Sequence, residues 1–118
     1  MAETLHDQMA GLLGVVRYDS GVIRGTTADK INYSLVADGP MLTRLAVHMT
    51  RHATAHGGSR NWMNGRTVED RERFRESAFR HFMQWYYGMD DEDHAAAALF
   101  NINGAEYVNE RLREGGDQ

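Results

Sequence analysis

The chain has 118 residues with 13 basic and 17 acidic side chains, so its formal net charge is −4, and 42% of its residues are hydrophobic. A chain of this length and composition is typical of one globular domain spanning residues 1–118, and it is too short for a second core. The lack of cysteine excludes disulfides and thiolate zinc sites, and the acidic balance argues against binding long nucleic acid. No apolar run approaches the ~18 residues of a membrane span, and no basic signal peptide opens the chain. A cytoplasmic protein is therefore expected.

The first third of the chain is predicted to form an irregular arm. Residues 1–16 have the apolar spacing of a short helix, which two glycines weaken. Residues 17–36 are expected to be extended or in a loop. Asp19, Ser20 and Gly21 form a turn signal, and the apolar residues Ile31 and Leu35 alternate with polar ones. A short β-hairpin is therefore possible in this arm.

Three long helices are predicted after the arm. The first covers residues 41–56, begins after Pro40 and ends at Gly57-Gly58. The second runs from an N-cap at Thr67, with Asp70 completing a capping box, to about residue 87. The third covers about residues 91–113 and follows four acids that suit a helix N-terminus. The expected fold is mostly α, a compact helical domain of three long helices. Gly104 inside the third helix permits close helix packing.

Polar side chains interrupt the apolar face of each predicted helix. They are His52 and His56 on the first helix, His81 on the second, and His94 and Asn101 on the third. Buried polar groups need partners, so these residues either satisfy one another in the core or line a shared ligand site. With His48, the first two also form an i, i+4, i+8 stripe, which alone matches no zinc motif.

Carboxylates form the second group of candidate site residues. Glu72 and Glu76 lie one turn apart on the second helix, and Asp90 and Asp93 are three residues apart at the start of the third. Oxygen ligands from two helices can hold Mg²⁺ or Mn²⁺ beside a phosphate chain. Alternatively, these acids are solvated and pair with arginines one turn away, as Glu72 would with Arg75.

Basic residues and a glycine-rich loop point to an anionic ligand. Residues 41–80 carry eight arginines against four acids, and Lys30 is the only lysine of the chain. Arginine favours bidentate contacts to phosphate or carboxylate, although this usage also fits a GC-rich genome. In the loop 57–62, glycines expose backbone N–H groups and Arg60 offers a fork for phosphate. Trp62 is placed either to stack on a base or to close the core.

The order of these motifs resembles the dATP/dGTP diphosphohydrolase N-terminal domain family, which is common in bacteriophages. The resemblance covers about residues 24–107. Its motifs in this chain are Lys30, His56-Gly57, Asn61-Trp62, Gly65, Ser77-Ala78, Arg80-His81, Trp85, Asp93-His94 and Asn101. This chain departs from the family pattern at Ala97, where members of the family often have a second histidine. The acids are also a poor copy of the EExxE and ExxD helices of all-α pyrophosphohydrolases, and the chain has no room for the second domain that often follows.

The resemblance implies hydrolysis of a purine deoxynucleoside triphosphate to monophosphate and pyrophosphate with Mg²⁺ or Mn²⁺, in the host cytoplasm if a phage encodes it. The expected metal ligands are Glu76, Glu92 and Asp93. The expected catalytic residues are His81, His94 and Glu76. The expected nucleotide-binding residues are His56, Arg60, Asn61, Trp62, Arg80 and Asn101.

Two other functions stay open. The chain is alternatively a nucleotide-binding or sequestering protein without turnover, or a structural protein whose histidines only satisfy its core. A homo-oligomer is expected in addition, because three helices make a thin core and Trp85, Tyr86, Tyr87 and Phe100 are hard to cover within one bundle.

Overall fold

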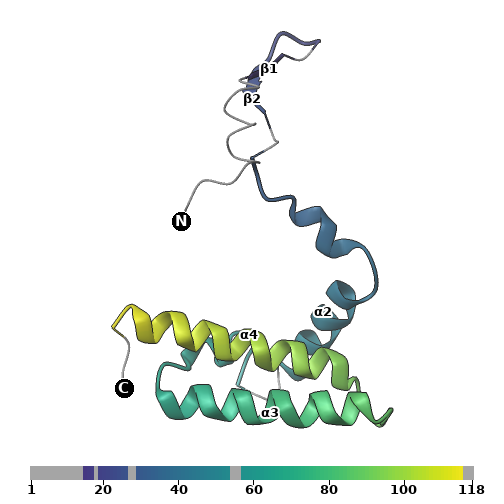
Figure 1. The fold of residues 1–118 in the computed structure, drawn as a ribbon, viewed down its shortest axis with the longest axis vertical. Coiled ribbons are helices and arrows are strands. Elements are labelled where there is room, and N and C mark those ends of the chain that lie inside the picture. The colour runs from purple at the N-terminus through teal and green to yellow at the C-terminus, as the bar shows by residue number, and fades with distance from the viewer. Residues whose placement is uncertain (1–14, 18, 27–28, 54–56, 116–118) are drawn as a thin grey trace. The chain divides into compact units, whose positions relative to one another are not determined.

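The computed structural model describes residues 15–17, 19–26, 29–53 and 57–115 (Figure 1). The chain forms two compact units, Met1–Leu35 and Val36–Gln118. The first unit contains a short hairpin and the second contains all three long helices, so each is described by itself.

The hairpin of the first unit joins β1 (Val15–Arg17) to β2 (Ile23–Gly25) in antiparallel register, with Val16 opposite Arg24. Gly21 supplies the turn with a φ of +90°, a conformation that glycine adopts without steric cost. A hairpin is therefore present, but its strands are not where the sequence pattern suggested. The helix expected over residues 1–16 is wrong at Val15 and Val16, which belong to β1, and its other residues lie outside the described part.

The alternating segment around Ile31 and Leu35 is a second correction. It forms no strand, and Tyr33–Ala37 is instead a 3₁₀ helix, η1. Its side chains are exposed, and Asn32 accepts hydrogen bonds from the backbone N–H and the hydroxyl of Ser34, at 3.2 and 2.6 Å. Alternation predicts a strand only where a partner strand covers one face, and the described residues provide none here.

The three long helices are α2 (Met41–His52), α3 (Val68–Tyr86) and α4 (His94–Arg113), and a short 3₁₀ helix, η2 (Asn61–Asn64), precedes α3. These helices confirm the mostly α fold class. Thr67 is the N-cap of α3, as predicted. Its Oγ1 accepts from the Asp70 N–H, and Asp70 Oδ2 accepts from the Thr67 N–H, both at 3.1 Å. Asp70 also accepts from the Arg66 N–H, and these backbone hydrogen bonds lower its pKa.

Helix α4 begins at His94 and not near Asp91. Asp93 is the N-cap, because its Oδ1 accepts from the Ala96 N–H at 3.1 Å. Asp91 and Glu92 therefore lie in the loop between α3 and α4 rather than in the first helical turn. This loop follows Gly88, whose φ of +77° ends α3.

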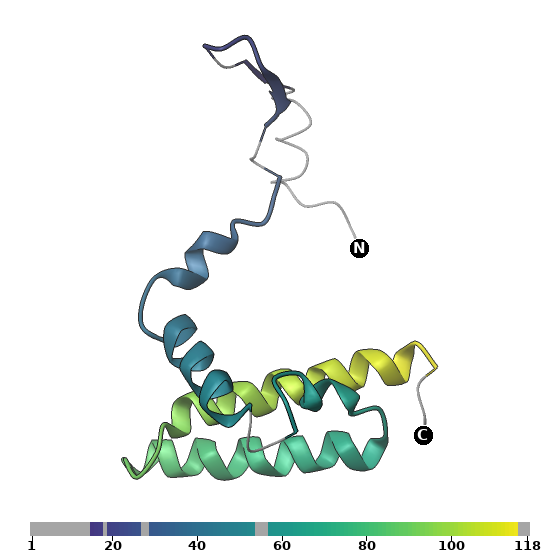
Figure 2. The same ribbon diagram turned by 180° about the vertical axis from the view of Figure 1, so that it is seen from behind.

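Helices α3 and α4 lie side by side in opposite directions, and α2 packs on α4 (Figures 1 and 2). Small residues make the contact between α3 and α4 close. A Cβ added at Gly104 would lie 2.6 Å from Cε1 of Phe74, which confirms the predicted role of this glycine. The buried apolar residues among those described are Ala78, Ala96, Ala97, Ala98, Ala105 and Val108. The core of the helical unit is therefore narrow.

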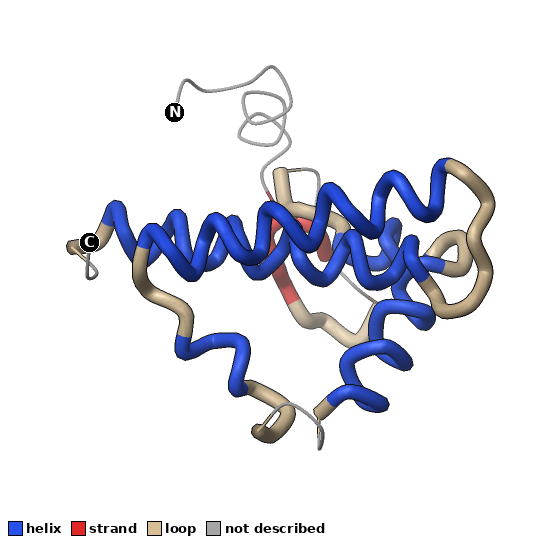
Figure 3. Tube along the Cα trace, turned by 90° about the horizontal axis from the view of Figure 1, so that it is seen from below, coloured by secondary structure: helices blue, strands red, loops and turns tan. Residues whose placement is uncertain are grey.

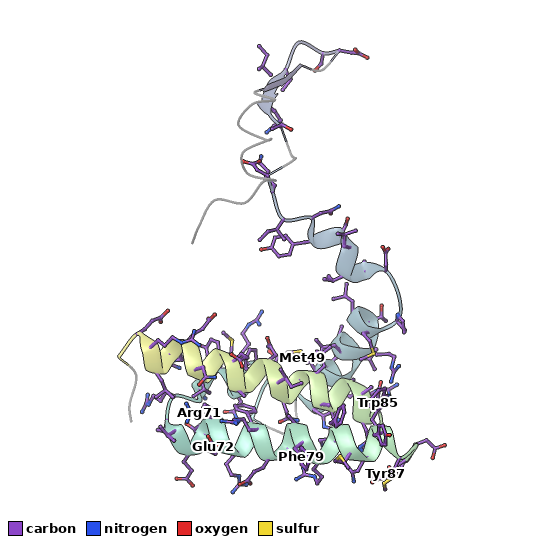
Figure 4. The ribbon with its side chains drawn as sticks, in the orientation of Figure 1. Met49, Arg71, Glu72, Phe79, Trp85 and Tyr87 are labelled. Atoms are coloured by element: carbon purple, nitrogen blue, oxygen red, sulfur yellow. The ribbon has the colours of Figure 1, made fainter. Side chains whose placement is uncertain are left out.

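Polar contacts also join α3 and α4. Arg71 donates to Asn109 Oδ1 at 3.0 Å, and Glu72 pairs with Arg71 and with Arg75 at 3.2 and 3.3 Å. Arg71 and Glu72 are labelled on α3 in Figure 4. The pairing of Glu72 with Arg75 is the solvated alternative considered for this acid. None of the described helices is long and apolar enough to cross a membrane.

The apolar seam expected on α3 is only half buried. Phe74 and Ala78 pack against α4, but Phe82 and Trp85 are 46% and 53% exposed. Helix α4 begins at His94, whose ring contacts His81, so residues 82–86 of α3 extend past the start of α4. Figure 3 shows the two helices joined there by the loop that precedes α4.

Candidate functional site

The loop between α3 and α4 brings two histidines and a carboxylate into one hydrogen-bonded chain. His94 is 2% exposed, its Nε2 lies 2.6 Å from Asp91 Oδ1, and its Nδ1 lies 2.9 Å from Nδ1 of His81. A carboxylate accepts, so the network assigns the His94 proton to Nε2 and leaves Nδ1 as an acceptor. His81 Nδ1–H is then the donor between the rings. The prediction that His56, His81 and His94 face a shared space is confirmed for His81 and His94, and His56 lies outside the described residues.

Glu92 completes a cluster with the two histidines. Its Oε1 lies 3.8 Å from His81 Nδ1, and one donor atom from each of the three residues lies within 4.8 Å of the others. Burial lowers the pKa of His81, although Glu92 opposes this effect. The hydrogen bond to His94 lowers the pKa of Asp91. His81 is therefore held in the neutral form that binds metals or accepts protons.

The cluster opens on a cavity of about 530 Å³ between α2, α3, α4 and η2. Its lining combines histidines, amides and aromatic rings: His48, Met49, His52, Ala53, Gly58, Ser59, Asn61, Trp62, Arg73, Phe74, Ser77, His81, Glu92, Ala97, Phe100 and Asn101. Met49, on α2, is marked in Figure 4. The lining holds one arginine, three histidines and one carboxylate, although the chain as a whole is acidic. Arg73 is the side chain of this lining that suits an anionic ligand.

A second hollow of about 550 Å³ adjoins the first. The two share six lining residues, namely Asn61, Trp62, Arg73, Phe74, Ser77 and Asn101. We call the two hollows together the cleft. The His81–Glu92 end lines only the first hollow, and Asn64, Gly65, Glu69 and Asp70 line only the second.

Aromatic rings form one wall of the cleft around Phe100. Its ring centroid lies 5.5 Å from that of His48, 6.0 Å from Trp62 and 6.3 Å from Phe74. Trp62 also packs edge-on against Tyr107 at 5.3 Å, so it serves the core and the cleft together. Its Nε1 is buried without a hydrogen-bond partner among the described residues.

Helix α2 contributes a histidine pair to the cleft. The rings of His48 and His52 lie 4.4 Å apart, as expected for side chains one turn apart. Burial, with a smaller contribution from the His52 charge, lowers the pKa of His48. His48 is therefore a second neutral imidazole that faces the same cavity as His81.

Asp93 makes a different contact from the one expected of a metal ligand. Its two carboxylate oxygens accept from Nε and Nη2 of Arg44 at 2.8 and 2.5 Å, and Oδ1 also caps α4. The Arg44 hydrogen bonds lower the pKa of Asp93 to about 2. Asp93 therefore joins α2 to the start of α4 rather than belonging to the His81–Glu92–His94 cluster.

A sequence model of the family described as dATP/dGTP diphosphohydrolase, N-terminal, matches residues 23–116. The chain belongs to this family. No curated protein sequence matches the chain, and no solved structure does. The matched range includes all of the cluster and all of the cleft.

Several motif residues of this diphosphohydrolase family surround the cleft. Asn61, Trp62, His81 and Asn101 line it, and His94 lies behind His81. Gly65 is close to the core, because an added Cβ would lie 3.0 Å from Cγ2 of Val108. Residues that carry the resemblance thus lie both in the cleft and in the packing beside it.

The structure does not bring the other predicted site residues to the cleft. Arg60, Arg80 and Glu76 are exposed, and the cleft is lined without them. His56 lies outside the described residues.

The sequence pattern predicts no role in ligand binding for Arg73, and Ser77 belongs only to a motif of the resemblance. A signal for both was available, because Arg73, Ser77 and His81 are spaced i, i+4 and i+8, which places them on one face of α3. His48 belongs to the histidine stripe of α2, but that it lines the same cavity as Glu92 of the α3–α4 loop is a tertiary feature.

Proposed function

We propose that the helical unit is a metal-dependent purine deoxynucleoside triphosphate pyrophosphohydrolase, which converts a dNTP and water to a dNMP and pyrophosphate. Membership of the diphosphohydrolase family supports a related hydrolase role. The observation that carries the proposal is the His81–Glu92–His94 cluster at one end of an aromatic cleft that also holds Arg73. A cavity of about 530 Å³ is also within the usual range for a small-molecule site.

The cluster residues fit a divalent cation. The His81 and His94 Nδ1 atoms are 2.9 Å apart, a separation that suits two ligands on adjacent positions of one ion. A cation held there would replace the hydrogen bond between the two rings, and the His81 proton would then be on Nε2. Asp91 holds the far nitrogen of His94, which is the usual outer partner of a metal-binding histidine. Because two of three donors are imidazoles, we favour Mn²⁺ over Mg²⁺. A cation held here would supply charge stabilisation to a phosphoryl oxygen.

The remaining residues have separate roles in the proposed reaction. Arg73 offers a guanidinium to the phosphates, and Ser77 a hydroxyl. Water attacks the α-phosphorus, the bond to the bridging oxygen breaks, and pyrophosphate leaves. His48, neutral because of its lowered pKa, accepts the proton of the attacking water. Trp62 and Phe100 hold the base.

One observation favours binding without turnover as the alternative. Ala97 lines the cleft one helical turn after His94 and offers no donor. The cluster therefore has three protein ligands, and a cation there depends on water or phosphate for its other positions. If those positions are too weakly filled, the chain sequesters nucleotide but does not hydrolyse it.

The test is to incubate the chain with dATP and Mn²⁺ and to measure dAMP and pyrophosphate. We expect turnover that Glu92→Gln reduces at least about tenfold, because a carboxamide is a poorer ligand than a carboxylate. Glu76→Gln is the matched control, since Glu76 is an exposed carboxylate outside the cleft, and it should leave the rate unchanged. Tight binding without product would favour sequestration, and no binding would reject both functions.

A further inference from the structure

Helix η2 carries Asn61 and Trp62 to the cleft, and a side chain from the last turn of α4 is hydrogen-bonded to it. Arg111 Nη1 donates to the Met63 carbonyl of η2 at 2.9 Å, across 48 positions of the sequence. The guanidinium carbon of Arg111 also lies 5.8 Å from the centre of the Tyr107 ring, and that ring packs edge-on against Trp62 at 5.3 Å. Arg111 therefore contacts the η2 backbone directly and reaches the Trp62 side chain through Tyr107.

One face of α4 connects the cleft to this contact. A stripe with spacings of four, three and four residues contains Phe100, Gly104, Tyr107 and Arg111. Phe100 lines the cleft, whereas Tyr107 and Arg111 lie outside its lining. The stripe thus passes from a residue that would touch a ligand to residues that hold another part of the wall.

The position of η2 depends on contacts with the rest of the fold. It is a four-residue 3₁₀ helix, whose internal hydrogen bonds have poorer geometry than those of an α-helix, and its N-cap Arg60 makes no side-chain capping hydrogen bond. The contact from Arg111 is charge-assisted and partly buried, which makes it one of the stronger kinds of hydrogen bond. Removing it would leave the Met63 carbonyl without this donor.

The proposed cation cluster lies at the opposite end of the same helix. Arg111 follows His94, the first residue of α4, by seventeen positions, which is about 25 Å along the helix. A change at Arg111 should therefore alter the aromatic end of the cleft and leave the cluster intact.

We propose that Arg111 is a positioning residue for the aromatic end of the cleft. It seats η2 through the Met63 carbonyl and the Tyr107 ring, so that Trp62 is in place to hold the base of a nucleotide. The inference rests on the proposed function for the identity of the ligand, and it adds a residue that touches no ligand itself. If η2 is unseated in a fraction of the molecules, the apparent affinity for the ligand falls with the seated fraction.

The first experiment measures by calorimetry how Arg111→Met binds two probes in the presence of Mn²⁺. One is the α,β-imido analogue of dATP, and the other is imidodiphosphate, which has the phosphates but no base. We expect the nucleotide analogue to bind at least about fivefold more weakly than to the wild type, and imidodiphosphate to bind equally well. Arg111→Lys keeps a cationic donor and should recover part of the loss. Arg113→Met, an exposed arginine in the same last turn, should change neither affinity.

The fluorescence of Trp62 reports the position of η2 without any ligand. Trp85→Phe leaves Trp62 as the single tryptophan of the chain. In this background, Arg111→Met should shift the Trp62 emission to the red and increase its quenching by acrylamide, because an unseated η2 exposes the indole to water. Arg113→Met should leave both unchanged.

Tyr107→Leu is the second variant, and it carries the test if Arg111→Met does not fold. It removes the ring that contacts both Arg111 and Trp62, so it should weaken the nucleotide analogue and spare imidodiphosphate in the same way.

The remaining outcomes overturn the inference. Unchanged nucleotide affinity in Arg111→Met and Tyr107→Leu, or an equal loss in Arg113→Met, would reject the positioning role. An equal loss for imidodiphosphate would show that the whole cleft depends on Arg111 and not its aromatic end. If the wild type binds no nucleotide analogue while Arg111→Met still shifts the Trp62 emission, the proposed function fails and Arg111 only stabilises the fold.

Discussion

His94 shows how one side chain can be structural and chemical together. It is buried at the first position of α4, and both ring nitrogens have partners, Asp91 on one side and His81 on the other. A buried imidazole with two partners is a satisfied core residue. The same arrangement leaves one nitrogen facing His81 and Glu92, and this is what a metal site requires.

Asp91→Asn tests the outer partner of His94. A carboxamide holds the His94 ring less strongly and allows the other tautomer, so we expect Mn²⁺ affinity to fall about 10- to 100-fold. Titration followed by electron paramagnetic resonance measures it. Asp90→Asn removes a neighbouring exposed carboxylate and is the control. Equal losses in both variants would show that only the overall acidity of the loop attracts the ion.

At the scale of elements, α2 is attached to the bundle mainly at its surface. None of its residues is buried, yet it carries His48 and His52 to the cleft. The bidentate pair of Arg44 with Asp93 ties it to the first turn of α4, next to Glu92 and His94. The position of α2 and the geometry of the cluster are therefore linked through Asp93.

Asp93→Asn removes this pair but retains an N-cap, since asparagine caps helices as well as aspartate does. We expect the free energy of unfolding at pH 7 to fall by about 1 kcal/mol, because both partners are partly exposed. The folded-state pKa is depressed, so this stability is present above pH 3.8 and is lost as the pH falls toward 2.

Denaturant unfolding at several pH values measures this difference, with Asp90→Asn as the control. The gap between the wild type and Asp93→Asn should close between about pH 4 and pH 2. A gap that is constant with pH would assign the loss to capping or packing instead of charge.

The close contact between α3 and α4 leads to a prediction about the stability of a variant at Gly104. Gly104→Ala places a methyl group 2.6 Å from a Phe74 ring carbon, too close for ordinary packing. Overpacking of this kind costs about 1–3 kcal/mol, and the better helix propensity of alanine returns about 1 kcal/mol. We therefore expect a net loss of up to about 2 kcal/mol in thermal or denaturant unfolding.

Phe74→Leu in the Gly104→Ala background provides a check on the mechanism. It removes the clashing ring atoms and should recover part of the loss. A variant Gly104→Ala as stable as the wild type would mean that the two helices separate at little cost.

At the scale of the whole molecule, the helical unit has large apolar side chains on its surface. Phe79, Tyr86 and Tyr87 are 67%, 68% and 72% exposed, while Val108 is the largest fully buried side chain among the described residues. Phe79 and Tyr87 are marked on α3 and at its end in Figure 4. Such a surface is typical of protein interfaces. Phe100, which was expected at the same contact, instead lines the cleft.

We therefore predict a homodimer or a higher even oligomer at micromolar concentration, with the end of α3 at the contact. Sedimentation equilibrium measures the mass against 13.4 kDa for one chain. Phe79→Glu should shift the distribution toward the monomer, because a buried charge without a partner is unfavourable at an interface. Asn103→Glu, exposed on α4, is the control. A wild-type chain that sediments as a monomer would end this prediction.

The sequence by itself determined the features that depend on neighbours along the chain. Thr67 and Asp70 cap α3 because their groups meet within one turn, Gly88 ends it, and the order of motifs identifies the family. It also placed His81 and His94 on faces that meet. Only the tertiary structure decided which charged residues join them. Arg73 lines the cleft and Arg80 does not, and Asp93 pairs with Arg44, 49 residues away. The residues next to such a carboxylate in the sequence do not show whether it binds a metal or an arginine, because the partner comes from another helix.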